Sequence, residues 1–141
     1  MTDSLDKIVN AYWTYYGRVW AWPDEASAVA PSAGDPDHPD ALECEWAVWE
    51  VSHMATAGSA DALTVVAALA AAAPSDAALR YLGAGPLEDL VDKHGAAFID
   101  ELVIATKLNP RLEVALATVR VDGRDGFSVD ALKGYLSTRR R

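Results

Sequence analysis

Residues 59–90 read SADALTVVAALAAAAPSDAALRYLGAGPLEDL, and the rest of the chain can be interpreted outward from this segment. Its first part, from Ala62 to Ala73, is apolar on nearly every side, which is typical of a helix buried at the centre of a domain. Pro74 ends this run, and Ser75 is a residue type that often caps the next helix. The segment therefore predicts short helices packed around a buried central one.

A junction rich in glycine and proline, Gly83-Ala84-Gly85-Pro86, follows within the same segment. We expect Gly83 to adopt the left-handed conformation that ends a helix, and Gly85 and Pro86 to supply the cap and the first position of the next helix. Glu88 then lies in the first turn, where the helix dipole favours a negative charge. A phosphate-binding loop is the weaker interpretation, because Pro86 lacks an N–H group and no lysine follows at a suitable distance. We therefore predict a structural role for this junction.

Apolar residues recur at helical spacing on both sides of this segment. They predict helices over about residues 4–20, 40–57, 60–73 and 96–108, with shorter ones near 79–82, 86–94, 112–119 and after 128. We expect residues 1–141 to form one all-α domain of seven to eight short helices in hairpin packing of the HEAT-like kind. Within it, residues 23–39 are expected to be a long acidic loop, and residues 122–141 a short helix with a basic tail.

The predicted helix over residues 40–57 carries an aromatic stripe. Leu42, Trp46, Trp49 and His53 follow one another at helical spacing and share one side of it. We interpret His53 as a partly buried ring among the tryptophans, while Glu43 and Glu50 lie on another face.

The charge of the chain is uneven. The net charge is −9, yet residues 19–79 hold ten Asp and Glu and no Lys or Arg, whereas residues 107–141 hold eight bases and four acids. A negative N-terminal half disfavours nucleic-acid binding, because phosphate affinity comes from Lys and Arg. The longest apolar run, Ala62 to Ala73, is also too short to cross a membrane.

The expected location is the cytoplasm. The N-terminus carries Asp3 and Asp6 where a secretory signal has positive charge. The single cysteine, Cys44, cannot form an internal disulfide, and we interpret it as a small buried residue.

Two groups of side chains contain residue types that bind metals or act in catalysis. Glu50 and His53 have the Glu-x-x-His spacing of carboxylate-bridged metal helices, but no second pair accompanies them, so no metal or other cofactor is expected. Glu88, Asp92 and His94 include acid and base groups, but capping and a solvated helix face are their favoured roles. We therefore predict that the protein is not an enzyme.

Several phrases of this sequence resemble a bacterial domain family of unknown function over about residues 42–121. They are residues 81–91 (YLGAGPLEDLV), His94-Gly95, residues 98–100 (FID), Asn109-Pro110-Arg111-Leu112 and residues 115–119, with Trp46 and Trp49 upstream. Leu112 stands where the family pattern has Phe, and Arg120 where it has Trp. The resemblance implies the fold and a bacterial origin and implies no activity.

Together these observations favour a non-catalytic bacterial protein-interaction domain. Our first hypothesis is an immunity- or antitoxin-like inhibitor that binds a basic effector protein through its acidic N-terminal half. The residues expected to bind the partner are Trp20, Trp22, Asp35, Asp37, Glu43 and Glu50. One alternative is a self-associating scaffold domain, for which a homodimer is left open; another is an enzyme that uses Glu88, Asp92 and His94.

Overall fold

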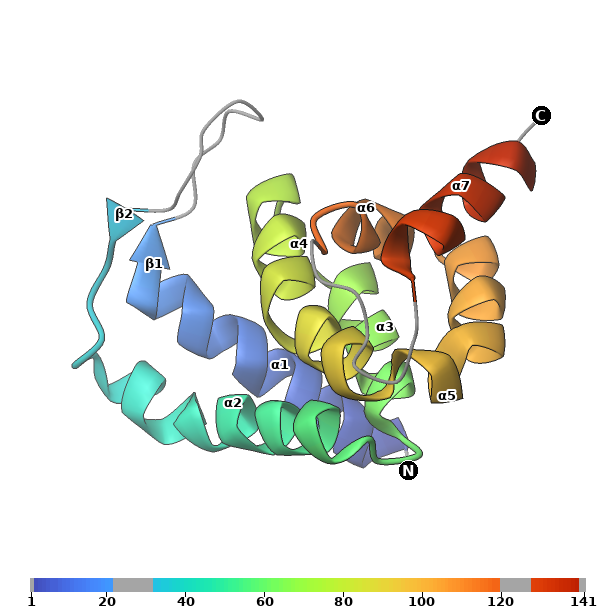
Figure 1. The fold of residues 1–141 in the computed structure, drawn as a ribbon. Helices are drawn as coiled ribbons and strands as arrows, with labels where there is room; N and C mark the ends of the chain where they lie inside the picture. The colour runs from blue at the N-terminus through green and yellow to red at the C-terminus, as the bar shows by residue number, and fades with distance from the viewer. Residues whose placement is uncertain (1, 22–31, 120–127, 140–141) are drawn as a thin grey trace.

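The computed structural model describes residues 2–21, 32–119 and 128–139 (Figure 1). Its helices are α1 (Thr2–Val19), α2 (Pro39–Ala57), α3 (Ala62–Ala71), α4 (Asp76–Leu82), α5 (Glu88–Leu108), α6 (Pro110–Leu116) and α7 (Val129–Arg139). A π-helical turn, Gly83–Leu87, joins α4 to α5, and two-residue strands β1 (Trp20–Ala21) and β2 (Ser32–Ala33) pair antiparallel. The predicted all-α fold is confirmed for the described residues. None of the described helices is both long and apolar enough to cross a bilayer.

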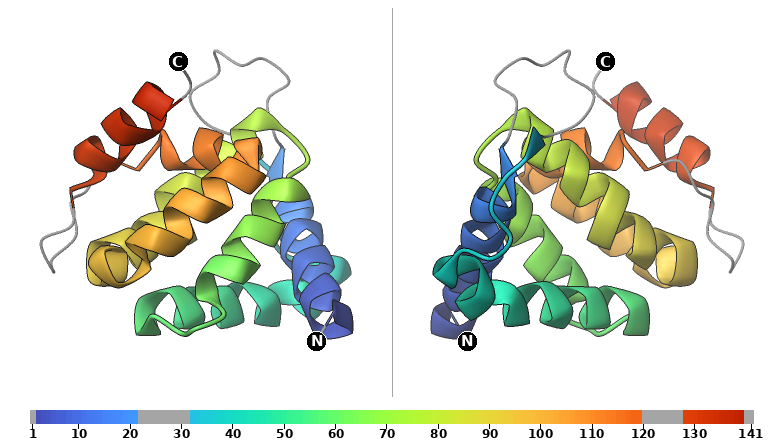
Figure 2. Two further views of the ribbon diagram at one scale, coloured as in Figure 1. Left: turned by 90° about the vertical axis from the view of Figure 1, so that its right-hand side faces the viewer. Right: turned by 90° about the vertical axis from the view of Figure 1, so that its left-hand side faces the viewer.

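Helix α3 lies at the centre of the domain, as its apolar sequence predicts (Figure 2). It contacts α1, α2, α4, α5 and α6, and Leu63, Val66 and Leu69 are each at most 5% exposed. The indole Nε1 of Trp13 in α1 donates a hydrogen bond of 2.9 Å to the Leu69 carbonyl, which fixes α1 against this helix. Burial of these side chains is the main stabilising contribution to the fold.

The turn between α5 and α6 is bonded to the C-terminal part of α3. Asn109 caps α6 by accepting a hydrogen bond from the Arg111 N–H, and its Nδ2 donates to the Ala67 carbonyl at 2.9 Å. The guanidinium of Arg111 donates to the Ala73 carbonyl at 2.7 Å, just beyond the end of α3. Carbonyls at a helix C-terminus need such external donors. The Asn-Pro-Arg sequence is therefore a structural clamp between α3 and α6.

The junction at Gly83 differs from the prediction. Gly83 is right-handed, with φ −64° and ψ −40°, so the expected left-handed conformation is wrong. Glycine is required there for a different reason, since a β-carbon would overlap the Ala115 carbonyl oxygen and the Thr118 hydroxyl of the segment packed against it. The left-handed glycine is Gly58, at the C-terminal cap of α2, with φ 67°. Gly85 does interrupt the helix ahead of Pro86, with φ −110° and ψ −105°.

Helix α5 consists of two helical segments that meet at His94, where the sequence predicts a break. The angles of His94 are non-helical, with φ −139° and ψ 17°, so the helix is kinked there. The kink brings the imidazole Nε2 to 2.9 Å from the Thr56 carbonyl, in the last turn of α2, so this nitrogen donates a hydrogen bond. The hydrogen bond from His94 therefore links the kink in α5 to the end of α2.

Helices α1 and α2 lie side by side and run in opposite directions (Figure 1). Tyr12 and Tyr16 on α1 are buried, and burial raises the pKa of both phenols. The ring of Tyr16 lies 5.0 Å from that of Tyr81 on α4. Tyr12 and Tyr16 of α1 thus pack between helices. The segment that precedes α2 is bonded to the end of α1. The Gly34 N–H donates a hydrogen bond of 2.8 Å to the Val19 carbonyl, and the Asp35 N–H donates one of 2.6 Å to the Arg18 carbonyl.

Candidate interaction surface on helix α2

Helix α2 is held firmly at both ends. At its start, Nδ1 of His38 accepts a hydrogen bond from the Asp40 N–H at 3.1 Å, and Pro39 occupies the first helical position. The Asp40 carboxylate also forms an ion pair of 3.2 Å with Arg18 of α1. At its end, the Gly58 N–H donates to the Met54 carbonyl, and His94 donates to the Thr56 carbonyl. Its outward side chains therefore project from a fixed support.

The buried face of α2 is made of small residues. Ala41, Ala47, Val51 and Ala55 are each at most 1% exposed and face the core. Their small side chains let the backbone of α2 approach its neighbours closely, which leaves no room for an indole on that side. The large residues of the helix are consequently placed on the opposite face.

The aromatic stripe predicted to contain a partly buried His53 is instead exposed. Leu42 is 61% exposed, Trp46 42% and Trp49 67%, and His53 is exposed beside them. The expectation for His53 is therefore wrong. Helical geometry puts these four residues opposite the buried alanines. Both faces of α2 are apolar, so hydrophobic periodicity alone cannot tell which of them faces the core.

We call this stripe the α2 face (Leu42, Trp46, Trp49 and His53). Carboxylates border it on both sides. Glu43 and Glu50 are exposed and two turns apart on one side, and Glu45 lies on the other. The Trp49 indole Nε1 donates a hydrogen bond of 2.9 Å to Oε1 of Glu45. Residues 33–79 contain no Lys or Arg, so this stretch itself supplies no Lys or Arg to pair with these carboxylates.

A shallow hollow of about 640 Å³ lies within the α2 face. Trp46, Trp49, Glu50 and His53 line it together with Ser52 and Thr56. Indole rings beside a carboxylate form a suitable site for a Lys or Arg side chain, because the ring faces and the carboxylate both attract a cation.

Comparison with known proteins places the chain in a family. The model of a family of unknown function, DUF6869, matches residues 34–125. The chain belongs to the DUF6869 family. No curated protein and no solved structure matches the chain significantly. The family domain includes α2 to α6 and therefore the whole α2 face, whereas α1 and α7 lie outside the matched range.

The partner-binding residues predicted from the sequence are spread over three places in this DUF6869 protein. Glu43 and Glu50 are exposed beside the α2 face, and Asp35 and Asp37 are exposed in the segment that leads into α2. Asp35 accepts a hydrogen bond of 3.2 Å from the Asp37 N–H. Trp20 is half-buried, with its ring 6.2 Å from that of Tyr81, and Trp22 lies outside the described residues.

Leu42, Trp46 and Trp49 are not among the partner-binding residues predicted from the sequence. One signal in the sequence does point to them, namely the series of small residues on one side of the helix, Ala41, Ala47, Val51 and Ala55. Such a series indicates a closely packed helix face. It follows that the bulky residues of the same helix are directed outward.

His94 belongs to the cluster of Glu88, Asp92 and His94 that the enzyme alternative uses. In the structure its ring donates a hydrogen bond to the Thr56 carbonyl. Burial raises the pKa of the neighbouring Asp89, opposed by Lys93. Glu88 and Asp92 are half-buried near it on α5. The alternative of an enzyme that uses Glu88, Asp92 and His94 stays a hypothesis.

Among the described residues, no three His, Cys, Asp or Glu side chains converge in a way that could hold a metal ion. Glu50 and His53 do line one hollow. Two ligands are too few for a tight site. The expectation of no bound metal stays a prediction.

Proposed function

We propose that this DUF6869 protein is a non-catalytic interaction domain that binds a basic protein surface through the α2 face. The observation that carries the proposal is the exposure of Trp46 and Trp49 between rows of carboxylates on a helix fixed at both ends. The finer form of the proposal is an immunity- or antitoxin-like inhibitor of a basic effector in the bacterial cytoplasm. Its further support is the acidic composition, with a net charge of −9, while the sequence resemblance supports only the bacterial origin.

Exposed tryptophans on a rigid helix are suited to anchor a complex. Tryptophan is the residue type most enriched among those whose truncation weakens protein complexes strongly. The hydrogen bond to Glu45 already holds the Trp49 ring, so less side-chain freedom is lost on binding. In the folded protein alone, an indole that is 67% exposed contributes little to stability.

The carboxylates specify the kind of partner. Glu43, Glu45 and Glu50 border the stripe, and Asp35 and Asp37 extend the acidic surface toward the start of α2. A basic partner is attracted by this field, and its Arg or Lys side chains are able to stack on the indoles. An acidic partner or a nucleic acid is repelled by the same charges.

The helices beneath the α2 face form its support. We further propose that they pack as stacked hairpins of the HEAT-like kind, seven to eight helices in all. Such a scaffold holds α2 at a constant position relative to α1 and α3, which both contact it.

The test uses proteins captured from the source organism by three purified forms of the chain. These are the wild type, the double variant Trp46→Ala/Trp49→Ala and the charge-reversed variant Glu43→Lys/Glu50→Lys. A matched control, Asp6→Lys/Asp130→Lys, makes the same change in net charge at exposed sites on α1 and α7. We expect the wild type and the control to capture a common basic protein that neither α2 variant retains.

Binding kinetics with that purified partner then test the mechanism. Truncating Trp49 is expected to raise the dissociation rate tenfold or more, since a central anchor contributes about 2 kcal/mol. Charge reversal is expected to lower mainly the association rate. Raising the salt concentration from about 0.05 to 0.5 M should lower the same rate, because the Debye length shrinks to a few ångströms. If all four forms capture the same proteins, the α2 face is not the binding site and the proposal is wrong.

A further inference from the structure

A second exposed apolar surface lies on the part of α5 that follows the kink. Ile99 is 42% exposed, Ile104 58% and Leu108 79%. This part of α5 runs between α3 and α7 (Figure 2) and forms a ridge with a groove on each side. We call it the α5 ridge (residues 99–108).

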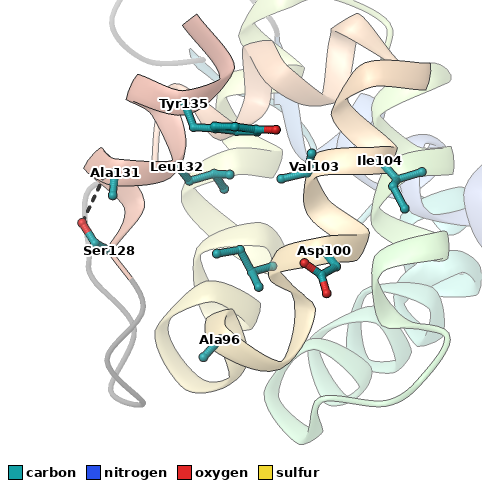
Figure 3. Close-up of a pocket in the computed structure, with 9 residues that line it drawn as sticks. Ala96, Asp100, Val103, Ile104, Ser128, Ala131, Leu132 and Tyr135 are labelled. Atoms are coloured by element: carbon teal, nitrogen blue, oxygen red, sulfur yellow. Dashed lines mark hydrogen bonds between the residues drawn. The ribbon is translucent and has the colours of Figure 1, made fainter. Parts of the chain in front are cut away.

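The groove between α5 and α7 has a volume of about 680 Å³. Leu132 and Tyr135 of α7 point toward Val103 of α5 across it, and Asp100 lies on its α5 side (Figure 3). The groove on the other side, between α5 and α3, has a volume of about 450 Å³ and includes Glu101 and Leu108. Ile104 lines both grooves and is therefore at the crest of the ridge.

Two of the three exposed charges on the ridge, Asp100 and Lys107, have opposite signs at positions that a twofold axis relates. Asp100 lies four residues before Ile104 on the α7 side, and helical geometry puts Lys107, three residues after Ile104, on that same side. The two charges are separated by seven residues, about 10 Å along the helix, so they are too far apart to pair within one chain. A second helix that runs antiparallel across Ile104 brings each Asp100 opposite the Lys107 of the other copy.

We propose that the α5 ridge binds a second copy of this chain, with the twofold axis passing near Ile104. The two copies of Ile104 then meet at the centre, and two Asp100–Lys107 pairs form on either side of them. Leu108, the most exposed of these apolar residues, covers the α3–α5 groove of the other copy. This isologous arrangement removes the apolar crest from water and pairs its charges.

Charge complementarity is what selects a second copy as the occupant. The α2 face is bordered by Glu43, Glu45 and Glu50 alone, so two α2 faces repel each other. On the α5 ridge, in contrast, twofold symmetry places Asp100 opposite the Lys107 of the other copy, and Glu101 is a further charge on the α3 side. The two surfaces are therefore expected to act independently.

Sedimentation velocity of the full chain from about 1 µM to about 1 mM tests the proposal. We expect a reversible dimer. Ile104→Glu places two carboxylates at its centre and should raise the dissociation constant at least a hundredfold. Asp100→Lys and Lys107→Asp should each raise it about tenfold, because both symmetry-related pairs become repulsive. The double variant Asp100→Lys/Lys107→Asp should recover a constant near that of the wild type.

Two controls separate this arrangement from other associations. Glu101→Lys makes the same charge change as Asp100→Lys, but on the α3 side, so it should weaken the dimer less. In a Cys44→Ser background, Ile104→Cys should give a disulfide-linked dimer on mild oxidation, whereas Thr14→Cys on the exposed side of α1 should not. Far-UV circular dichroism checks that each variant is folded.

A wild-type protein that stays monomeric at about 1 mM overturns the proposal. So does a dimer that Ile104→Glu leaves intact. A double variant no better than the single variants contradicts the twofold pairing of Asp100 with Lys107 and equally overturns it.

Discussion

Replacing Gly83 by alanine is expected to destabilise the protein by about 2 kcal/mol. Two contributions of opposite sign set this value. Gly83 has right-handed helical angles, so alanine gains up to about 1 kcal/mol through its better helix propensity. The new methyl group, however, overlaps the Ala115 carbonyl oxygen and the Thr118 hydroxyl. Overpacking of this kind costs about 1 to 3 kcal/mol, and the upper end applies here for a structural reason.

The obstacle is a backbone atom in a buried segment. Leu112, Ala115 and Leu116 are at most 1% exposed, and the Ala115 carbonyl already accepts a 2.7 Å hydrogen bond from the Thr118 hydroxyl. Relief of the overlap therefore requires α4 and α6 to separate, which opens contacts that are well packed. Rotation of one side chain is insufficient, because Ala115 contributes its backbone oxygen to the overlap.

Urea unfolding followed by far-UV circular dichroism measures the free energy of unfolding. The matched control is Gly134→Ala on α7, where nothing lies within 4 Å of the added β-carbon. It should be stabilised by about 0.5 to 1 kcal/mol. Gly83→Ala and Gly134→Ala are therefore expected to change stability in opposite directions.

A Gly83→Ala protein as stable as the wild type would refute the packing explanation. Gly83→Asn adds a second test, because asparagine tolerates the left-handed conformation better than alanine does. If close approach is the cause, the larger asparagine destabilises more than alanine. A less harmful asparagine would instead restore the left-handed interpretation.

Four further predictions concern other parts of the chain. Gly58→Ala should cost about 1 to 3 kcal/mol in thermal unfolding, because φ is 67° and its β-carbon would lie 2.7 Å from the His94 ring. His94→Ala should cost about 1 kcal/mol and accelerate amide exchange in the last turn of α2, since the bond to the Thr56 carbonyl is lost. Burial raises the pKa of the Asp89 carboxyl above 3.8, so this group favours the folded state most at acidic pH. The stability of the wild type relative to Asp89→Asn should therefore fall as the pH rises through the pKa of the folded state. Urea unfolding at successive pH values measures this difference. Elemental analysis should find no stoichiometric metal, and a chelator should leave the melting temperature unchanged; one bound zinc or iron per chain would contradict this.

Local sequence signals predicted much of the helical framework. Ser75 and Ser128 cap α4 and α7 by accepting hydrogen bonds from the N–H groups of Ala78 and Ala131. Asn109 begins α6 in the same way. Capping, proline breaks and apolar periodicity act over a few residues, so the residues themselves reveal them. The burial of α3 also follows from its sequence, because a helix that is apolar nearly all round has no side suited to water.

The candidate site was less predictable, because it depends on which neighbours each face meets. The sequence predicts Glu43 and Glu50 as partner-binding residues, whereas the exposure of Trp46 and Trp49 is seen only in the structure. An indole and a row of alanines are both apolar, so composition does not distinguish the two faces of α2. Only the close approach of the core to Ala47 and its neighbours excludes the indoles from the interior.

The roles of Gly83 and His94 depend on contacts between residues far apart in the chain. Gly83 was expected to be special for its own backbone angles, yet it is required by residues 32 and 35 positions later, Ala115 and Thr118. His94 interrupts α5, as the sequence predicts, but its ring also bonds to Thr56, 38 residues earlier. The local sequence contains the turns and caps that begin and end helices. The faces that meet, and the glycines that must stay small, follow only from how the finished helices pack, because packing joins atoms that the order of residues does not bring together.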